Sequence, residues 1–247
     1  MDIRSFIDST YLKTVSQAGL DENQNILVVK TFIQEAIDEK FKLIMIRPEM
    51  ISLAKTMITE SVSNVQIGTV IDFPEGNSDI EVKLFEANQA IADGADELDF
   101  VCNYEAFKSG KTDLVKTEIL RGTQLALENN KIIKWIIEVA ALNDRQIIQL
   151  SALIKNVVIS NFKESDYANV FVKSSTGFYK TKDNEPNGAT IPSIIMMIEN
   201  ASPLSIKAAG GVRNYQDAIA MIKLGVKRIG TSAAKAIVNG ENNHNEY

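Results

Sequence analysis

The stretch Leu204-Ser-Ile-Lys-Ala-Ala-Gly-Gly-Val-Arg213 leads from a short apolar run into a glycine pair, and the fold can be worked out from it. A helix start follows at Asn214, with Asp217 three residues later, and Gly225 marks the end of that helix. The next apolar run, Arg228-Ile-Gly-Thr231, is again short. A strand, a helix and a second strand in this order form the repeating unit of a parallel α/β sheet.

Similar short apolar runs recur along the whole chain. Eight of them in 247 residues give about 31 residues per strand–helix unit, which is the repeat length of a (β/α)8 barrel. We therefore predict an α/β fold, a single-domain (β/α)8 TIM barrel over residues 1–239, with residues 240–247 as a flexible C-terminal tail. The expected strands are Ser5–Ile7, Leu43–Ile46, Gln66–Ile71, Glu97–Cys102, Trp135–Val139, Val170–Lys173, Leu204–Ala208 and Arg228–Thr231.

Helix start and stop signals separate the expected strands. Ser78-Asp-Ile-Glu81 predicts a capping box before a helix that ends at Gly94. Pro48 and Pro192 stand where a first helical turn tolerates proline. The main alternative is an open, doubly wound sheet, which would carry a glycine fingerprint after an early strand. The first expected strand–helix turn has no such fingerprint, so the barrel is favoured.

The composition narrows the available chemistry. Lys and Arg total 26 against 32 Asp and Glu, and this net charge of −6 does not favour nucleic acid as a partner. His244 is the only histidine and Cys102 the only cysteine, which excludes a histidine-based triad, a histidine-rich zinc site and an intrachain disulfide. The longest apolar run, Ile194–Ile198, is far shorter than the roughly 18–20 residues of a membrane span. We expect a cytoplasmic protein that acts neither on a membrane nor on nucleic acid.

Two lysines end strands that should be buried. Lys173 closes the run Val170–Lys173, and Lys207 occupies the equivalent position on the next strand. A buried ammonium is costly, so the plainer interpretation of Lys173 is a rim lysine paired to a carboxylate. Neighbouring strands lie about 4.8 Å apart, however, and two ammonium groups at that range depress each other's pKa. A partly neutral lysine is a nucleophile that can form a Schiff base with a carbonyl substrate.

Asp99 is the third candidate for chemistry. Strand alternation puts Glu97 and Asp99 on one face of their strand, and Leu98 and Phe100 on the other. If the apolar pair packs against the outer helices, the carboxylates point into the barrel. A carboxylate between two lysines could hold them in place, relay protons, or do both.

The turns after the last strands are rich in glycine. Gly210-Gly-Val-Arg213 and Gly230-Thr-Ser-Ala233 each lead towards a helix, and Ser175-Thr-Gly177 follows the strand before them. Backbone N–H groups free of side-chain bulk bind anions at such places, with the hydroxyls of Thr231 and Ser232 as further donors. These turns therefore predict a phosphate site and a phosphorylated carbonyl substrate.

Several stretches of the chain follow the pattern of a known family. They are Asp8–Leu12, Phe73–Gly76, Gly94–Asp99, Ile136–Glu138, Val172–Phe178, Lys207–Arg213 and Tyr247. Together they resemble the deoxyribose-phosphate aldolase family, and the two lysine motifs, in this order, are the most specific part of the resemblance. The resemblance implies a class I aldolase on a TIM barrel, which cleaves 2-deoxy-D-ribose 5-phosphate to D-glyceraldehyde 3-phosphate and acetaldehyde in deoxynucleoside catabolism, without a metal or cofactor.

The resemblance also implies a role for each matched residue. Lys173 matches the Schiff-base lysine, and Lys207 the lysine that lowers its pKa. Asp99 matches the proton-relay acid, and Tyr247 matches a tyrosine that assists proton transfer at the methyl carbon of acetaldehyde. The other matches are Asp8 and Thr10, near the substrate hydroxyls, and Gly177, Gly210, Gly211, Gly230, Thr231 and Ser232, around the phosphate.

The sequence departs from the family pattern at Ser9, Tyr11, Met45 and Asp72, all outside the lysine motifs. Two further classes of function stay open at this point. One is another phosphosugar enzyme, either a different Schiff-base aldolase or an isomerase that needs a carboxylate base but no imine. The other is a barrel that binds a phosphorylated metabolite without catalysis. For partners we expect a small phosphorylated sugar and consider a homodimer.

Overall fold

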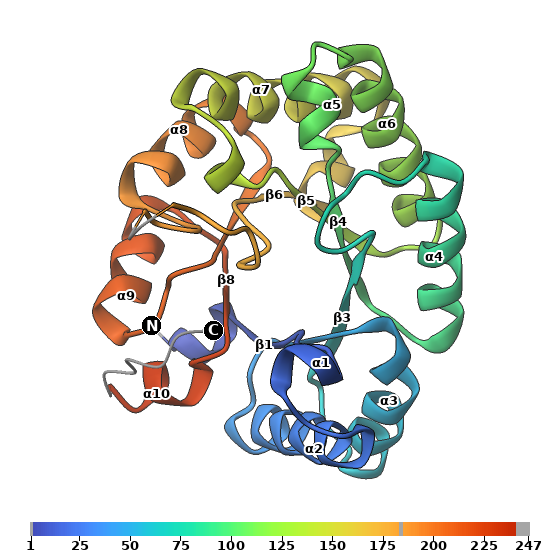
Figure 1. Ribbon diagram of the computed structural model, residues 1–247, viewed down its shortest axis with the longest axis vertical. Helices are drawn as coiled ribbons and strands as arrows, with labels where there is room; N and C mark the ends of the chain where they lie inside the picture. The colour runs from blue at the N-terminus through green and yellow to red at the C-terminus, as the bar shows by residue number, and fades with distance from the viewer. Residues whose placement is uncertain (1, 183–184, 241–247) are drawn as a thin grey trace.

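Eight parallel strands form a closed barrel, in which each strand is hydrogen-bonded to the strands before and after it in the chain. The computed structural model describes residues 2–182 and 185–240, and Figure 1 shows the helices ringed around the strands. Pairing of the last strand with the first closes the ring, so the predicted (β/α)8 TIM barrel is confirmed. The strands are β1 (Ile7–Tyr11), β2 (Leu43–Ile46), β3 (Gln66–Ile71), β4 (Glu97–Val101), β5 (Ile132–Ile136), β6 (Val170–Lys173), β7 (Ser205–Ala209) and β8 (Arg228–Thr231).

The helices alternate with the strands and cover the outside of the barrel (Figure 1). Short 3-10 turns are found at Ile3–Phe6, Pro48–Met50, Val139–Ala141 and Glu164–Asn169. In the described part of the chain the α-helices are α1 (Val15–Ala18), α2 (Glu22–Glu39), α3 (Ile51–Glu60), α4 (Ile80–Asp93), α5 (Tyr104–Lys108), α6 (Thr112–Glu128), α7 (Asp144–Asn161), α8 (Ile191–Ala201), α9 (Tyr215–Leu224) and α10 (Ala234–Val238).

The strand bounds agree with the sequence prediction except at two places. β2, β3, β6 and β8 are as predicted, β4 ends one residue earlier, and β7 begins and ends one residue later. The first strand was misplaced, since Ile3–Phe6 is a 3-10 turn and β1 begins at Ile7. The fifth strand begins at Ile132 and ends at Ile136, before the predicted range is complete. Both errors arise because polar residues, Asp8 and Lys134, interrupt the apolar pattern while their side chains lie buried.

Residues along the strands alternate between two environments. Phe100 of β4 and Trp135 of β5 belong to the large apolar layer between the strands and the helices, with ring centroids 5.1 Å apart. The indole N–H of Trp135 donates to Thr123 of α6 at 3.0 Å, so this buried polar atom is satisfied. The opposite face of β4 carries Asp99, which is fully buried and bonded to lysines of other strands. The predicted alternation on β4 is confirmed.

Two predicted helix starts have different outcomes. The start at Asn214 is confirmed, because its side chain accepts a 2.8 Å hydrogen bond from the N–H of Asp217. The capping box at Ser78 is wrong, because α4 is preceded by Asp79 and has no side-chain cap. The backbone N–H and the hydroxyl of Ser78 instead donate to Asp72, at 2.9 and 2.7 Å. Ser78 thus serves the turn after β3.

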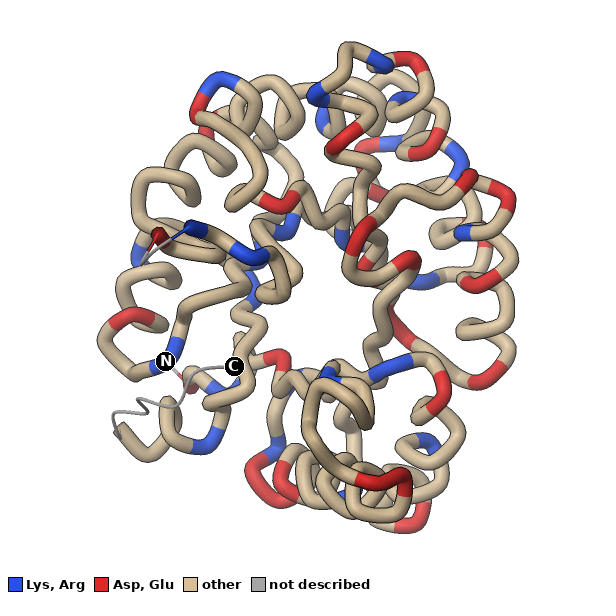
Figure 2. Tube along the Cα trace, viewed as in Figure 1, with Lys and Arg blue, Asp and Glu red and all other residues tan. Residues whose placement is uncertain are grey.

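The loops that follow the strands lie together at one end of the barrel. Parallel strands bring their carboxyl ends to the same mouth, so the loops that follow them meet there. Figure 2 shows acidic and basic residues along the central strands as well as on the outer helices. No helix within residues 2–182 and 185–240 is long and apolar enough to cross a membrane.

Candidate active site

A single carboxylate in the barrel interior contacts three lysines. Asp99 has no exposed surface, and its Oδ1 lies 2.6 Å from Nζ of Lys134. Its Oδ2 lies 2.9 Å from Nζ of Lys173 and 2.8 Å from Nζ of Lys207. The structure therefore brings together the three residues that the sequence singled out, and it adds Lys134, which the sequence reasoning missed.

Strand register creates this arrangement. Lys173 of β6 is the direct partner of Lys207 on β7, as strand spacing predicted. Lys134 of β5 is likewise the register partner of Asp99 on β4. Neighbouring parallel strands place such partners about 4.8 Å apart, and this spacing lets one carboxylate reach amines from three strands.

A second layer of charge lies against this cluster. Arg228 of β8 donates to both carboxylate oxygens of Glu97 at 3.0 Å, and its Nε donates to Asp8 at 2.7 Å. Asp8 also pairs with Nζ of Lys207 at 2.6 Å, and Glu97 with Nζ of Lys134 at 2.6 Å. These bidentate and shared contacts satisfy groups that would otherwise be costly to bury.

The charge balance of the network singles out one lysine. Among the described residues it contains three carboxylates (Asp8, Glu97, Asp99) and four cationic side chains (Lys134, Lys173, Lys207, Arg228), so the fully charged network carries +1. Lys134 and Lys207 each pair with two carboxylates, whereas the structure gives Lys173 only Asp99. Loss of one proton from Lys173 makes the buried network neutral.

The pKa shifts agree with this balance. Burial lowers the pKa of Lys173 to about 8, assisted by Lys207 and Lys134 and opposed by Asp99. Burial would raise the pKa of Asp99, but Lys134, Lys173 and Lys207 together hold it well below its usual range. Burial also acts to lower the pKa of Lys134, yet Asp99 and Glu97 raise it overall. Lys173 is therefore the amine that can be neutral near physiological pH.

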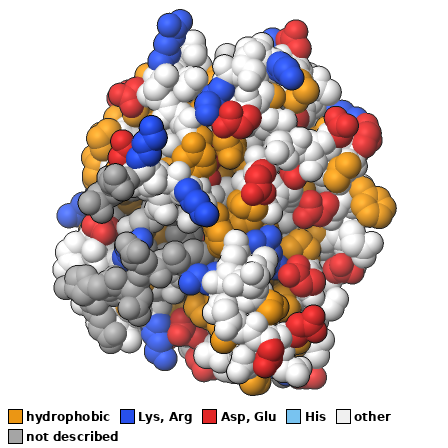
Figure 3. Space-filling view, viewed as in Figure 1, with side chains coloured by type: hydrophobic (Ala, Val, Ile, Leu, Met, Phe, Trp, Pro, Cys, Tyr) orange, Lys and Arg blue, Asp and Glu red, His pale blue; other side chains and the backbone are white. Residues whose placement is uncertain are grey.

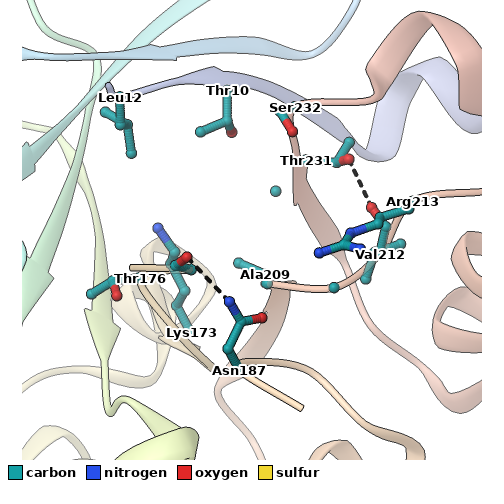
Figure 4. A pocket seen from close by; sticks show the side chains of 14 residues that line it. Thr10, Leu12, Lys173, Thr176, Asn187, Ala209, Val212, Arg213, Thr231 and Ser232 are labelled. Atoms are coloured by element: carbon teal, nitrogen blue, oxygen red, sulfur yellow. Dashed lines mark hydrogen bonds between the residues drawn. The ribbon is translucent and has the colours of Figure 1, made fainter. Parts of the chain in front are cut away.

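Lys173 opens onto a pocket at the mouth of the barrel. Figure 4 shows its amino group pointing into this pocket, which encloses about 540 Å³ including its open mouth. Hydrophobic and charged side chains both surround the middle of this face of the molecule (Figure 3). The lining residues are Thr10, Leu12, Lys173, Thr176, Gly177, Asn187, Ala209, Gly210, Gly211, Val212, Arg213, Gly230, Thr231 and Ser232.

The predicted glycines all line this pocket, and their backbone explains why they are glycine. Gly177, Gly210 and Gly211 have φ values of 80, 82 and 84°, a region that residues with a Cβ rarely adopt. At Gly230 a Cβ would lie 3.1 Å from Cε of Lys207, so the missing side chain leaves room for that lysine. Three turns of bare backbone thus face one cavity, as an anion site requires.

The two hydroxyl residues of the predicted phosphate site, Thr231 and Ser232, differ in their contacts. Thr231 donates to the carbonyl of Val212 at 2.8 Å and accepts the N–H of Ala233 at 3.0 Å. The Thr231 hydroxyl therefore links the turns after β7 and β8, and its proton is directed at Val212 and not at a ligand. Ser232 is exposed at the pocket. Arg213 also lines the pocket, with its guanidinium turned inward in Figure 4. A cation two residues after a glycine pair is the sequence signal that could have found it.

The two residues expected near substrate hydroxyls are separated. Thr10 lines the pocket and donates to the carbonyl of Asp8 at 2.9 Å. The side chain of Asp8 is fully buried against Arg228 and Lys207 and is not among the described residues that line the pocket. Asp8 therefore acts on Lys207 in this structure, and its contact with a substrate hydroxyl stays a prediction.

The remaining candidates lie elsewhere. Cys102 is buried, and burial with Glu118 nearby raises the pKa of its thiol well above the usual value, which fits a packing residue. Tyr247 and His244 lie outside the described residues. Among the residues that are described, no group of three or more His, Cys, Asp and Glu side chains could hold a metal ion.

The chain is similar to known aldolases in sequence and in fold. A family model described as DeoC/LacD family aldolase matches residues 12–240. The chain is 37% identical over 244 residues to a deoxyribose-phosphate aldolase of Thermococcus gammatolerans, covering 98% of both, and 35% identical over 248 residues to one of Streptococcus suis, covering 100% of both. Among solved structures, a tetrameric deoxyribose phosphate aldolase from Aeropyrum pernix matches with a TM-score of 0.75 and 27% identity, covering 96% of this chain and 89% of that one.

Proposed function

Because the chain belongs to the DeoC/LacD family of aldolases and is an aldehyde-lyase, we propose that it reversibly cleaves 2-deoxy-D-ribose 5-phosphate into D-glyceraldehyde 3-phosphate and acetaldehyde through a Schiff base on Lys173. The observation that carries this proposal is the amino group of Lys173. It opens onto a glycine-lined pocket, is 2.9 Å from a buried carboxylate, and has a pKa lowered to about 8.

The lowered pKa makes Lys173 a usable nucleophile. At pH 7 an amine with a pKa of about 8 is neutral in about one molecule in eleven. A lysine at its ordinary pKa of about 10.4 would be neutral in about one molecule in 2,500. The buried network therefore supplies over two orders of magnitude more of the attacking form.

The reaction follows from the positions of the proton carriers. Neutral Lys173 adds to the C1 aldehyde to give a carbinolamine, and loss of water, with a proton moved by Asp99 and Lys207, leaves an iminium ion. Asp99 and Lys207, through water, take the proton of the C3 hydroxyl, and C3–O becomes the carbonyl of D-glyceraldehyde 3-phosphate. The C2–C3 bond breaks, and its electron pair moves towards the iminium to give an enamine. Protonation of C2 and hydrolysis of the imine then release acetaldehyde and restore Lys173.

The glycine turns hold the other end of the substrate. The phosphate binds to backbone N–H groups of the turns after β6, β7 and β8, with Ser232 and Arg213 beside them. Fixing the phosphate places C1 at Lys173, and this converts imine formation into an intramolecular step. We assign Tyr247 the transfer of a proton to C2. A homodimer, a cytoplasmic location and a role in deoxynucleoside catabolism stay predictions.

Borohydride trapping tests the proposal directly. Incubation with acetaldehyde and borohydride should add 28 mass units, a reduced two-carbon adduct, and peptide mapping should locate it on Lys173, by the mass balance of imine reduction. The Lys173→Leu variant should neither trap nor release acetaldehyde. Turnover that is insensitive to borohydride would point to an isomerase, and binding without acetaldehyde release would point to a non-catalytic barrel.

A further inference from the structure

Glu138 follows β5 in a backbone conformation that is unusual for its residue type. Its φ of 55° and ψ of 69° are left-handed, a region that favours glycine. The N–H groups on either side, of Ile137 and Val139, donate to the carbonyls of Lys173 and Ser174 at 3.0 and 2.9 Å. In a regular parallel pair, donors two residues apart reach carbonyls two residues apart. Here the carbonyls are consecutive, so Glu138 is one residue in excess and the chain is kinked at this point.

The kink gives Glu138 a specific contact. Glu138 is 1% exposed, and its Oε2 accepts hydrogen bonds from the backbone N–H of Thr176, at 3.1 Å, and from the Thr176 hydroxyl. The hydroxyl of Ser175 lies close enough to this carboxylate to act on it by hydrogen bonding. Burial raises the pKa of Glu138, against the lowering effects of Thr176, Ser175 and Lys173. A strained backbone and a buried acid near the reacting lysine mark a place under functional constraint.

The contact acts on the turn that joins both halves of the proposed site. Thr176 lies three residues after Lys173, lines the pocket, and accepts the N–H of Phe178 through its hydroxyl at 3.0 Å. The next residue is Gly177, one of the three left-handed glycines around the cavity. Both backbone and side chain of Thr176 are held by one carboxylate, so that carboxylate determines where the turn stands relative to Lys173.

We propose that Glu138 is a positioning residue that, through Thr176, sets the spacing between the imine-forming lysine and the phosphate pocket. This proposal rests on the proposed function. A phosphorylated sugar is anchored at two points, C1 and phosphate, and its carbon chain fixes the distance between them. A shift of the turn by a fraction of an ångström therefore costs reactivity for this substrate. The same sugar without phosphate is anchored only at C1 and depends much less on that spacing.

Three variants at one position separate the backbone from the side chain. Glycine accepts a φ of 55°, so Glu138→Gly keeps the kink and removes the carboxylate, whereas Glu138→Ala removes the carboxylate and strains the backbone. Glu138→Gln keeps an oxygen that can accept both bonds from Thr176. Glu118→Gln is the matched control, since Glu118 is another buried carboxylate, paired with Lys83 and absent from the residues that line the pocket.

The readout is the ratio of kcat/KM for 2-deoxyribose 5-phosphate to kcat/KM for 2-deoxyribose. We expect Glu138→Gly to lower this ratio by roughly tenfold or more, since small misplacements at a reacting centre have effects of this order. Glu138→Gln should stay within about threefold of the parent protein, because its amide oxygen restores the contact to Thr176. Thr176→Val added to Glu138→Gly should lower the ratio little further, because residues that act as one unit are not additive.

A second measurement needs no turnover. Calorimetry with inorganic phosphate should show weaker binding in Glu138→Gly than in Glu138→Gln. An unchanged ratio and unchanged phosphate affinity in Glu138→Gly would overturn the proposal, as would an equal fall of the ratio in Glu118→Gln. Failure to trap an adduct on Lys173 in the parent protein would instead remove the proposed function. The phosphate measurement would then decide whether Glu138 shapes the pocket.

Discussion

Replacing Lys207 by methionine should raise the pKa of Lys173 and move the activity to higher pH. The two Nζ atoms lie 2.8 and 2.9 Å from the same oxygen of Asp99, so they are at most the sum of these distances, 5.7 Å, apart. At an effective dielectric constant of about 20, two unit charges at that separation repel by about 3 kcal/mol, which corresponds to about 2 pKa units. The buried network of Lys207→Met would carry three cations and three carboxylates, and the loss of a proton from Lys173 would no longer neutralise it.

The expected pKa of Lys173 in this variant is therefore about 10 instead of about 8. The neutral fraction at pH 7 falls from about one in eleven to about one in a thousand, so the electrostatic effect should lower kcat/KM about 100-fold at pH 7. This part of the loss should be recovered near pH 10, whereas the part due to the missing proton carrier should remain at every pH. The assay is the pH profile of kcat/KM from acetaldehyde release, coupled to a dehydrogenase. The control is Lys223→Met, which removes an exposed lysine of α9 and changes the net charge equally.

The pH at which kcat/KM falls on the acid side of its profile, the acid limb, shows whether Lys207 lowers the pKa of Lys173. If the acid limb of Lys207→Met stays near pH 8 and the activity is reduced equally at every pH, the electrostatic reasoning is refuted. Lys207 would then act by moving protons alone. A shift of the limb in Lys223→Met as large as in Lys207→Met would show that net charge, and not the buried cluster, controls the lysine.

Three further predictions concern stability and the end of the chain. Lys173→Met should unfold at pH 7 with a free energy roughly 1–3 kcal/mol higher than that of the parent protein, as measured by urea denaturation. The pKa of Lys173 is about 8 in the folded state and near 10.4 in the unfolded state, so folding disfavours the protonated amine. The gain in stability should shrink as the pH rises from about 8 to about 10.4, and a loss of stability would contradict the assignment. Gly122→Ala should lower stability by about 1–3 kcal/mol, since the new Cβ would lie 2.7 Å from the ring of the buried Trp135 and this overlap outweighs the better helix propensity of alanine. A thermal melt checks this, and an unchanged melting temperature in Gly122→Ala would contradict it. Deletion of Tyr247 should lower kcat far more than it weakens phosphate binding, because the proposed proton transfer to C2 follows binding; equal kcat in the truncated protein would exclude that role.

Periodicity was sufficient to predict the strands whose residues are apolar on both faces. β2 matches its predicted bounds because Leu43–Ile46 is apolar throughout. β1 and β5 do not match their predicted bounds, because Asp8 and Lys134 are buried in the barrel interior, where they form ion pairs. A pattern that assumes apolar residues in the interior cannot predict a strand whose buried charge is paired with a residue of another strand.

The chemistry-bearing residues were partly visible in the same way. Lys173, Lys207 and Asp99 stood out because charges in apolar runs are costly unless they are paired or functional. Arg228 lies at a strand start, where a charge reads as exposed. Lys134 lies directly before the predicted strand Trp135–Val139, although it is the third of the five residues of β5. Glu138 carried no signal of its special backbone, because its left-handed φ depends on the pairing of β5 with β6.

The sequence by itself determined the barrel, the strands that bear Lys173 and Lys207, and the glycine turns, because these depend on local alternation and spacing. The resemblance implied that Lys173 is the reacting lysine, but only the tertiary structure supplied the physical reason why Lys173 loses its proton. That outcome depends on how many carboxylates each amine reaches across the barrel, two for Lys134 and Lys207 and one for Lys173. Electrostatic energy depends on distances between residues far apart in the chain, and closure of the barrel sets those distances.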